Sequence, residues 1–386
     1  MANNNDNKVL NVPHLRFPEF SGEWKMCTIG ELTTKVGSGV TPRGGEAVYK
    51  TEGHPFVRSQ NVGLGNLLLD DIAFIDEETH LRQKNTELQF NDVLLNITGA
   101  SIGRSALVDK QIVGGNVNQH VCIIRTKENL VPSFICSFLL SNYGQRQIDS
   151  FQAGGNRQGL NFEQIKSIKI TIPSKDEQIK IAKLLRAIDE RIAIQNKIID
   201  KLQSLIKGLR VCCMQRNGSN NVYLSEIAQI YQPQTISSAE LTEDGFLVYG
   251  ANGIIGKYKD YNHKTEQICI TCRGNTCGMV NYTKPMSWIT GNAMVINTDK
   301  YQDKVYKKYL YHYLSAYNFN SIISGSGQPQ IVRTPLEKLK ITLPTISEQK
   351  QKAMILDKIQ DKIEINHNVL NLYILQKQYL LRQMFI

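Results

Sequence analysis

The sequence predicts an α+β protein with two mostly β domains, each followed by a long helix. Three observations predict this fold class. The phrase KITIPSKDEQ at 169–178 returns as KITLPTISEQ at 340–349, so the chain contains a tandem repeat. Short apolar runs between Gly, Asn and Pro precede each phrase, which is typical of strands. A seven-residue apolar pattern follows each phrase and predicts a long, packed helix.

Length and charge set the first limits on what the chain can be. It has 386 residues, a formal net charge of +10 and a pI of about 9.1. This length can hold two or three domains, and the basic balance indicates a polyanionic partner such as nucleic acid. The N-terminal segment has no apolar signal core, and runs such as 134–140 are too short to span a bilayer. We therefore expect a cytoplasmic protein whose eight cysteines are reduced thiols.

The repeat extends upstream of the shared phrase. At an offset of 171 residues, Gln178 aligns with Gln349. At an offset of 175, the segment 92–108 aligns with 267–283, glycine on glycine at two positions. Shorter helices are expected within the two blocks, at 132–147 and 305–317. The expected division is a tail, a β domain, a helix, a second β domain and a second helix, at 1–22, 23–172, 173–216, 217–343 and 344–386.

Each long helix carries one apolar seam with gaps of four and three residues, the pattern of a coiled coil. The predicted seam positions are Ile181, Leu185, Ile188, Ile192, Gln195, Ile199 and Leu202 in the first helix, and Leu356, Ile359, Ile363, Asn366, Leu370 and Tyr373 in the second. Both seams carry an amide at the same place. Gln195 and Asn366 are either tolerated polar residues or a polar layer that fixes register and pairing.

Pairing of the two helices would let the repeat close on itself with pseudo-two-fold symmetry. We expect an antiparallel coiled coil with one β domain at each end, the two inverted relative to each other. Duplex DNA has the same symmetry, so inverted modules can read two separated half-sites. Residues 166–216 hold 12 Lys/Arg and 5 Asp/Glu, whereas 1–165 hold 15 and 17. Either the basic residues of the near-neutral β domains cluster on one face, or partners neutralise much of the phosphate charge.

Base reading requires Arg, Lys, Asn, Gln, Ser or Thr on polar loops. The candidate DNA-binding residues of the first block are Arg43, Arg58, Gln60, Asn61, Ser101, Arg104, Asn118, Gln119, Arg157 and Gln158; those of the second are Tyr249, Asn252, Lys257, Arg273, Asn275, Asn292, Gln328, Gln330 and Arg333. The loops 99–104 and 274–278 are favoured because their glycines let the backbone approach a phosphate closely. The plainer interpretation of any one of these residues is an ordinary polar loop.

Motifs for catalysis are missing from the sequence. It has no Asn-Pro-Pro-aromatic motif of an adenine methyltransferase, no HExxH and no convincing acidic nuclease cluster. GANGIIGKY at 250–258 departs from a phosphate-binding loop at its first required Gly and at the final Ser/Thr, so a Gly-rich loop between strands is favoured. His263, Cys269, Cys272 and Cys277 could form a zinc set. Their apolar counterparts in the first block favour core positions instead, and we expect no metal.

PHLRFPEFSGEW at 13–24, the paired ITxPxxxEQ phrases, FLVYGANGIIGKY at 246–258 and GSGQPQI at 325–331 resemble the specificity subunits of Type I restriction–modification enzymes. The resemblance covers nearly the whole chain. It implies two target recognition domains that read a bipartite DNA site across a spacer. It also implies that the paired helices act as a spacer ruler and as a docking surface for two modification subunits, which restriction subunits then join.

The same resemblance implies a DNA-binding chain that is not an enzyme. It implies that this chain binds no cofactor, whereas its partner subunits use S-adenosylmethionine, ATP and Mg²⁺. Two alternatives stay open at this point. One is a self-contained DNA methyltransferase or nuclease, which the missing motifs disfavour. The other is a non-enzymatic coiled-coil scaffold whose β blocks bind protein, and selection for a split DNA sequence would exclude it.

Overall fold

The structure is a computed structural model that describes residues 11–152, 159–214, 220–251, 253–325 and 327–386. The chain divides into two compact units. Unit 1 comprises 1–195 and 369–386, and unit 2 comprises 196–368. Each long helix therefore contributes one part to each unit.

The described residues of unit 1 form three small sheets. A four-stranded sheet has the order β2 (Thr33–Ser38), β8 (Val121–Thr126), β5 (Val93–Asn96), β6 (Ser105–Leu107). A three-stranded sheet has the order β4 (Ala73–Ile75), β3 (His54–Val57), β7 (Asn116–Val117). A ribbon pairs β1 (Lys25–Thr28) with β9 (Lys169–Ile172) and brings the two ends of the domain together. The helices are α1 (Glu77–Arg82), α2 (Pro132–Leu140), α3 (Asn142–Ser150), α4 (Phe162–Ser167) and the start of α5 (Lys175–Met214).

Unit 2 repeats this topology. Its four-stranded sheet has the order β11 (Gln229–Tyr231), β17 (Ala293–Asn297), β14 (Ile268–Thr271), β15 (Val280–Tyr282). Its three-stranded sheet is β13 (Gly253–Tyr258), β12 (Phe246–Gly250), β16 (Trp288–Ile289), and its ribbon pairs β10 (Asn220–Tyr223) with β18 (Lys340–Leu343). The helices are α6 (Lys307–Ala316), α7 (Arg333–Glu337), the start of α8 (Ile346–Gln383) and the end of α5. In both units the central strand of the three-stranded sheet has one antiparallel and one parallel neighbour. The predicted duplication is therefore present strand for strand.

The glutamine that ends each repeated phrase is buried and makes three hydrogen bonds. In unit 1, Gln178 Oε1 accepts a hydrogen bond from Val131 N (2.9 Å), while its Nε2 donates to Asn129 O and Pro173 O. In unit 2, Gln349 makes the same three bonds, including one from Tyr306 N (2.8 Å). The repeated glutamine thus fastens the start of α2 or α6 to the start of a long helix.

The single helix predicted at 132–147 is wrong, because the structure breaks it at Ser141. Ser141 adopts an extended backbone, and its hydroxyl accepts from Gly144 N as the N-cap of α3. A Cβ at Gly144 would lie 2.4 Å from Phe138 O, so the chain can turn this tightly only with glycine there. The second expected helix, at 305–317, corresponds to α6.

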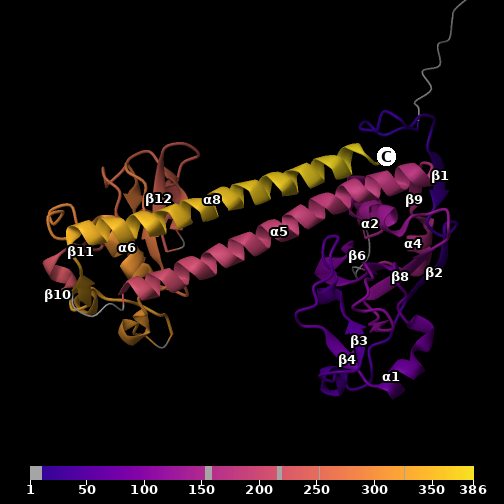
Figure 1. Ribbon diagram of the computed structural model, residues 1–386, viewed down its shortest axis with the longest axis horizontal. Coiled ribbons are helices and arrows are strands. Elements are labelled where there is room, and N and C mark those ends of the chain that lie inside the picture. Colours follow the sequence, from indigo (N-terminus) through magenta and orange to yellow (C-terminus); the bar gives the residue numbers. More distant parts are fainter. Residues whose placement is uncertain (1–10, 153–158, 215–219, 252, 326) are drawn as a thin grey trace, which may run out of the picture. The chain divides into compact units, whose positions relative to one another are not determined.

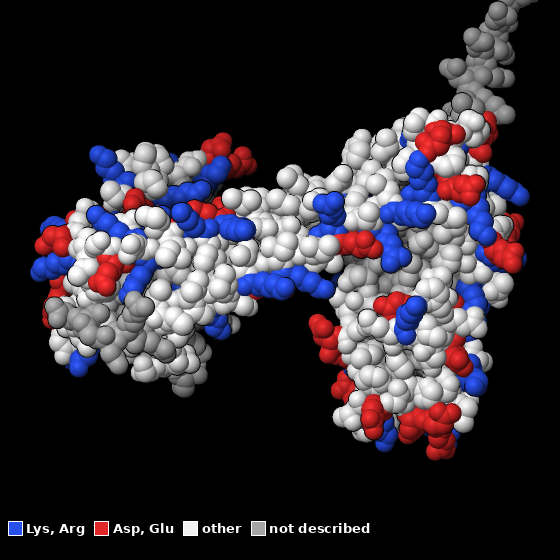
Figure 2. Space-filling view, in the orientation of Figure 1, with Lys and Arg blue, Asp and Glu red and all other residues white. Residues whose placement is uncertain are grey.

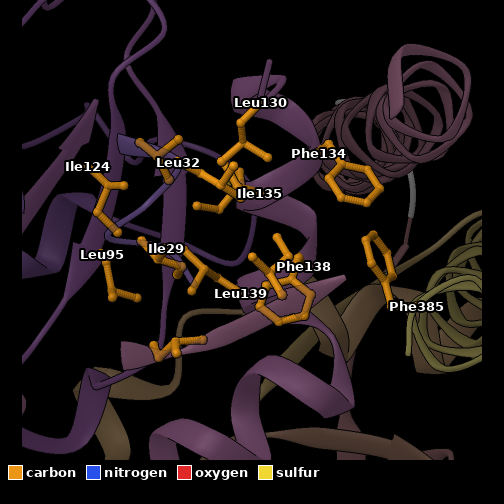
Figure 3. Packing of buried hydrophobic residues seen from close by; sticks show 14 of the residues in the cluster. Ile29, Leu32, Leu95, Ile124, Leu130, Phe134, Ile135, Phe138, Leu139 and Phe385 are labelled. Carbon is orange, nitrogen blue, oxygen red and sulfur yellow. The ribbon is translucent and has the colours of Figure 1, made fainter. Parts of the chain in front are cut away.

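The ends of the long helices complete the core of unit 1. Ile181, Leu185 and Ile188 of α5 pack in one apolar cluster with Leu380 and Phe385, the latter just beyond the end of α8. The Phe385 ring lies 5.2 Å from the Phe134 ring and 6.2 Å from that of Phe138, between centroids (Figure 3). Figure 1 shows α2 beside α5, with β3, β4 and α1 farther away. The start of α5 therefore meets the end of α8 in this unit.

In unit 2 the end of α5 meets the start of α8. Ile206 packs with Leu356 and Ile363 in a separate apolar cluster. The two helices therefore run antiparallel within each unit. Of the predicted seam, Ile181, Leu185, Ile188, Gln195, Ile199, Leu356 and Ile363 are buried, and Ile192, Leu202, Ile359, Asn366, Leu370 and Tyr373 are half-buried. The interlocking geometry of a coiled coil and the role of the two amides stay predictions.

The described part of the N-terminal tail packs against the start of α5. Arg16 forms a two-pronged pair with the buried carboxylate of Glu177, at 2.7 and 2.8 Å. This pair raises the pKa of Arg16. Within the described residues, no helix combines the length and apolar character needed to cross a membrane.

Candidate nucleic-acid interface

One end of β5 carries a cluster of loops in unit 1. Leu160 N donates to Ile97 O, and Gly103 N donates to Asn96 O, so the chain on both sides of the 99–101 turn is fixed. Thr98 forms a bridge with Gly159. Gly99 and Gly103 have φ values of 71° and 84°, in the left-handed region that favours glycine. The predicted loop 99–104 is therefore a tightly held turn at the end of a buried strand.

Unit 2 builds the same backbone frame at the end of β14. Ile331 N donates to Cys272 O, and Gly278 N donates to Thr271 O. Arg273 forms the bridge with Gln330 that Thr98 forms with Gly159 in unit 1. Each residue of this frame follows its counterpart in unit 1 by 171 or 175 residues, the two offsets found in the sequence. The two units therefore present the same loop frame with different side chains, as expected if one frame serves to read two different half-sites.

Polar side chains connect the loops of unit 1. Asn96 Nδ2 donates to Ser59 O (2.8 Å) and to Ser101 Oγ (3.1 Å). His120 Nδ1 lies 2.6 Å from Thr98 Oγ1. Gln119 Oε1 accepts from Thr41 N (3.0 Å), which brings the loop of Arg43 to the same place. The structure thus brings Ser101, Gln119 and the loop that carries Arg43 together.

The exposed candidates form a smaller set than the sequence predicted. Arg43, Gln60, Arg104 and Gln119 are exposed in unit 1, and Arg58 and Ser101 are half-buried. In unit 2, Arg273, Asn275, Asn292, Gln328 and Gln330 are exposed around the repeated frame, where Gly274 N bonds Pro329 O and Cys272 N bonds Asn292 O. Arg157, Gln158 and Asn252 lie outside the described residues. Which of these side chains touches a base stays a prediction.

Three of the predicted base-reading residues have buried side chains. Asn61 is fully buried and donates to Leu68 O and Asp71 Oδ1. Asn118 accepts from His120 N, and the Tyr249 hydroxyl accepts from Lys284 N. A buried side chain that already has hydrogen-bond partners would lose them on turning outward, at a cost of about 1–3 kcal/mol.

Four further candidates bond to acidic groups of the chain. Asp71 accepts from Arg58 and Gln60, and Arg58 also lies over the Tyr49 ring. Lys257 pairs with Asp244 (3.2 Å), and Arg333 pairs with Glu337 one turn along α7 (2.7 Å). These contacts restrain the four side chains, but Gln60 and Arg333 stay exposed and therefore remain candidates for the reading surface.

Sequence reasoning missed several polar residues of this region. His120, Thr98 and Thr41 form hydrogen bonds that connect the loops of unit 1. Asp71 accepts hydrogen bonds from the candidates Arg58, Gln60 and Asn61. In unit 2, Gln232 Nε2 donates to Gly291 O (3.0 Å). A signal was available for Thr98, because it aligns with Arg273 at the offset of 175. No such signal marked Thr41 or Asp71, which lie in segments without a clear repeat.

The cysteine set of unit 2 fills core positions. Cys269 and Cys272 are buried in two different apolar clusters. His263 bonds the Tyr231 hydroxyl (2.8 Å) instead of approaching them. Burial raises the pKa of Cys269 to about 12, so it stays protonated. In the part of the chain that the structure describes, no three His, Cys, Asp or Glu side chains are placed to hold a metal ion.

Charge differs between the ends of unit 1. Figure 2 shows acidic side chains gathered at the end that carries α1. Asp76 caps this helix, and Glu77 and Glu78 occupy its first turn. Acidic side chains repel phosphate, so nucleic acid is not expected at the first turn of α1.

A family model described as the Type I restriction modification DNA specificity domain matches residues 21–204 and 217–372. The chain belongs to this family. Its two matches correspond to the two repeats seen in the structure. The Type I specificity family therefore accounts for both halves of the chain with one kind of domain.

Individual members of the Type I specificity family match to different extents. The MjaVIII specificity subunit of Methanocaldococcus jannaschii is 24% identical over 404 residues, covering 91% of this chain and 88% of its own. The EcoprrI specificity subunit of Escherichia coli is 32% identical over 140 residues, covering 35% and 34%. The solved S subunit from M. genitalium is similar in fold, with a TM-score of 0.66, 17% identity, and 97% and 99% of the two chains covered.

Proposed function

We propose that this chain is the DNA-specificity subunit of a Type I restriction–modification complex. Its two units are target recognition domains, each of which reads one half of a bipartite DNA target. The observation that carries this function is the loop frame at the end of β5 and again at the end of β14, within two matched specificity domains. Two copies of one frame with different exposed side chains suit a target with two different halves.

The long helices act as a ruler between the two half-sites and as a docking surface for partners. Support comes from apolar side chains outside the predicted seam. Leu372, Leu375 and Tyr379 of α8 are more than half exposed in unit 1, and Leu205 of α5 is half exposed in unit 2. Exposed apolar stripes of this kind mark protein interfaces. We assign one modification subunit to each unit, and restriction subunits join through the modification subunits.

The chain itself acts without catalysis and binds no cofactor. S-adenosylmethionine, ATP and Mg²⁺ are used by the partner subunits. The absence of methyltransferase, nuclease and phosphate-loop motifs from the sequence supports this part of the proposal. Calorimetric titration of the purified chain with S-adenosylmethionine should give no binding heat, and stoichiometric binding would favour a self-contained methyltransferase.

The decisive experiment maps methylated adenine at base resolution in cells that express this chain with its modification subunit. Cells with the modification subunit alone provide the control. A two-part methylated motif that appears only with this chain would establish the function and give the target. If no motif appears although the two proteins co-purify, the chain is a scaffold and not a specificity subunit.

A further inference from the structure

In unit 1 the loop between β3 and β4 is seated on the long helices. Lys377 Nζ of α8 donates to Leu64 O (3.0 Å) and pairs with Asp189 Oδ1 of α5 (2.6 Å). Gly65 lies so close that a Cβ there would be 3.0 Å from Lys377 Nζ and 3.5 Å from Leu140 Cδ1. Lys377 is largely buried at this point, with 14% of its side chain exposed. We call this site on the long helices, formed by Leu140, Asp189 and Lys377, the seat. In unit 1 the chain fills the seat with its own backbone.

The counterparts of the seat in unit 2 can be read from the repeat. The offset of 171 fixed by Gln178 and Gln349 places Asp189 on Gln360 and Lys377 on Ile206. The offset of 175 for the short helices places Leu140 on Ser315. Gln360, Ile206 and Ser315 all line one groove of unit 2, of about 450 Å³. The groove is thus the counterpart of the occupied seat.

The groove is open because unit 2 lacks the loop that fills the seat in unit 1. Residues 58–72 connect β3 with β4, whereas β12 ends at Gly250 and β13 begins at Gly253. Serine in place of Leu140 further widens the site.

The groove also differs from its counterpart in charge. Lys207 and Arg210 of α5 line it, where unit 1 has Gln378 and Leu381 of α8. Arg210 donates hydrogen bonds to His312 Nδ1 (3.2 Å) and Gln360 Oε1 (3.4 Å). Its guanidinium group also lies over the Tyr311 ring. The residues that line the groove include no Asp or Glu. A basic, preformed groove favours an occupant with carboxylate and carbonyl oxygens.

We propose that this groove binds a polypeptide loop of the modification subunit that presents main-chain carbonyls and a carboxylate to Lys207 and Arg210. The inference rests on the proposed function. Polypeptide is favoured over nucleic acid because the counterpart seat in unit 1 holds polypeptide, through a carbonyl on an ammonium group. The two modification subunits then bind unequally, since this loop finds an open groove in unit 2 and a filled seat in unit 1.

Two variants of the full chain test the inference by titration with the modification subunit, followed by native mass spectrometry. Lys207→Glu reverses the charge of the groove, and Ser315→Leu fills it. Lys300→Glu, an exposed lysine elsewhere in unit 2, is the matched control. We expect both groove variants to weaken binding of one copy by about tenfold or more, with the second copy, DNA binding and thermal unfolding unchanged.

Three outcomes would overturn the inference. Wild-type affinity for both copies in both variants would show that the groove takes no part in docking. Weaker DNA binding with unchanged subunit binding would assign the groove to nucleic acid. A wild-type chain that binds no modification subunit would remove the proposed function itself, and the wild-type titration separates that failure from the other two.

Discussion

The shared structural role of Gln178 and Gln349 explains why the sequence at 169–178 recurs at 340–349. Each glutamine is buried, and its amide satisfies one helix N–H donor and two loop carbonyls. Glutamate could not donate to the carbonyls, and a shorter Asn would not reach all three groups. The phrase therefore recurs because one side chain performs the same structural task in each unit.

At the same scale, Arg104 and Arg273 should each affect one half of the DNA target. They lie in the repeated loops at different positions, since Arg273 aligns with Thr98 and Arg104 with Met279. Arg104→Ala and Arg273→Ala should each relax one half of the methylated motif, by about 1–3 kcal/mol of discrimination per base. Methylation mapping measures this effect, with Arg82→Ala at the acidic end of unit 1 as the control. Equal weakening at all sequences would mark phosphate contacts instead.

His263 should make unit 2 sensitive to acid. Burial lowers the pKa of His263 below its usual 6.5, and nearby Lys307 lowers it further against the opposite effect of Asp299. Below pH 6.5 the unfolded chain binds a proton that the folded chain resists, so the free energy of unfolding falls as the pH falls. Denaturation at pH 7.5 and 5.5 measures the slope, which His263→Gln should reduce. An unchanged slope in the variant would exclude His263 as its source.

Among the elements, the long helices and the repeated strands were predictable, whereas the break between α2 and α3 was not. The seven-residue pattern marked the helices because burial on one face imposes a period. The break at Ser141 could not be predicted, since 132–140 is apolar on most positions and hides the cap that follows. At the site, the glycines of the two predicted loops adopt φ values in the left-handed region. The burial of Asn61 and Tyr249 depends on long-range packing and left no local pattern.

A mutation where the end of α8 packs into the core of unit 1 should lower the stability of that unit strongly. Phe385 is fully buried against Phe134 and Phe138. Phe385→Ala should destabilise unit 1 by about 3–5 kcal/mol, because it leaves a cavity. Hydrogen exchange should accelerate in β5, β8 and α2 and stay unchanged in β14 and β17. Tyr379→Ala, at a largely exposed position of α8, is the control, and equal acceleration in both units would contradict this assignment.

For the whole molecule, duplication means that each unit can change its DNA half-site independently. The two units share sheet orders and loop frame but differ in their exposed side chains. Replacing residues 220–343 with the matching domain of another Type I specificity subunit should change one half of the methylated motif and keep the other. Methylation mapping of the chimera tests this, with the reciprocal exchange of 25–172 as its control. A change in both halves would show that the units do not read separately.

The contribution of α8 to unit 1 also has a consequence for the order of folding during synthesis. Unit 2 is one continuous stretch, so it can close as soon as residue 368 has left the ribosome. The core of unit 1 waits for Phe385, which follows Phe134 by 251 residues. The domain that is translated first therefore finishes folding last. Until then its Phe134 and Phe138 face an open core, and the nascent chain depends on rapid completion or on chaperones to avoid aggregation.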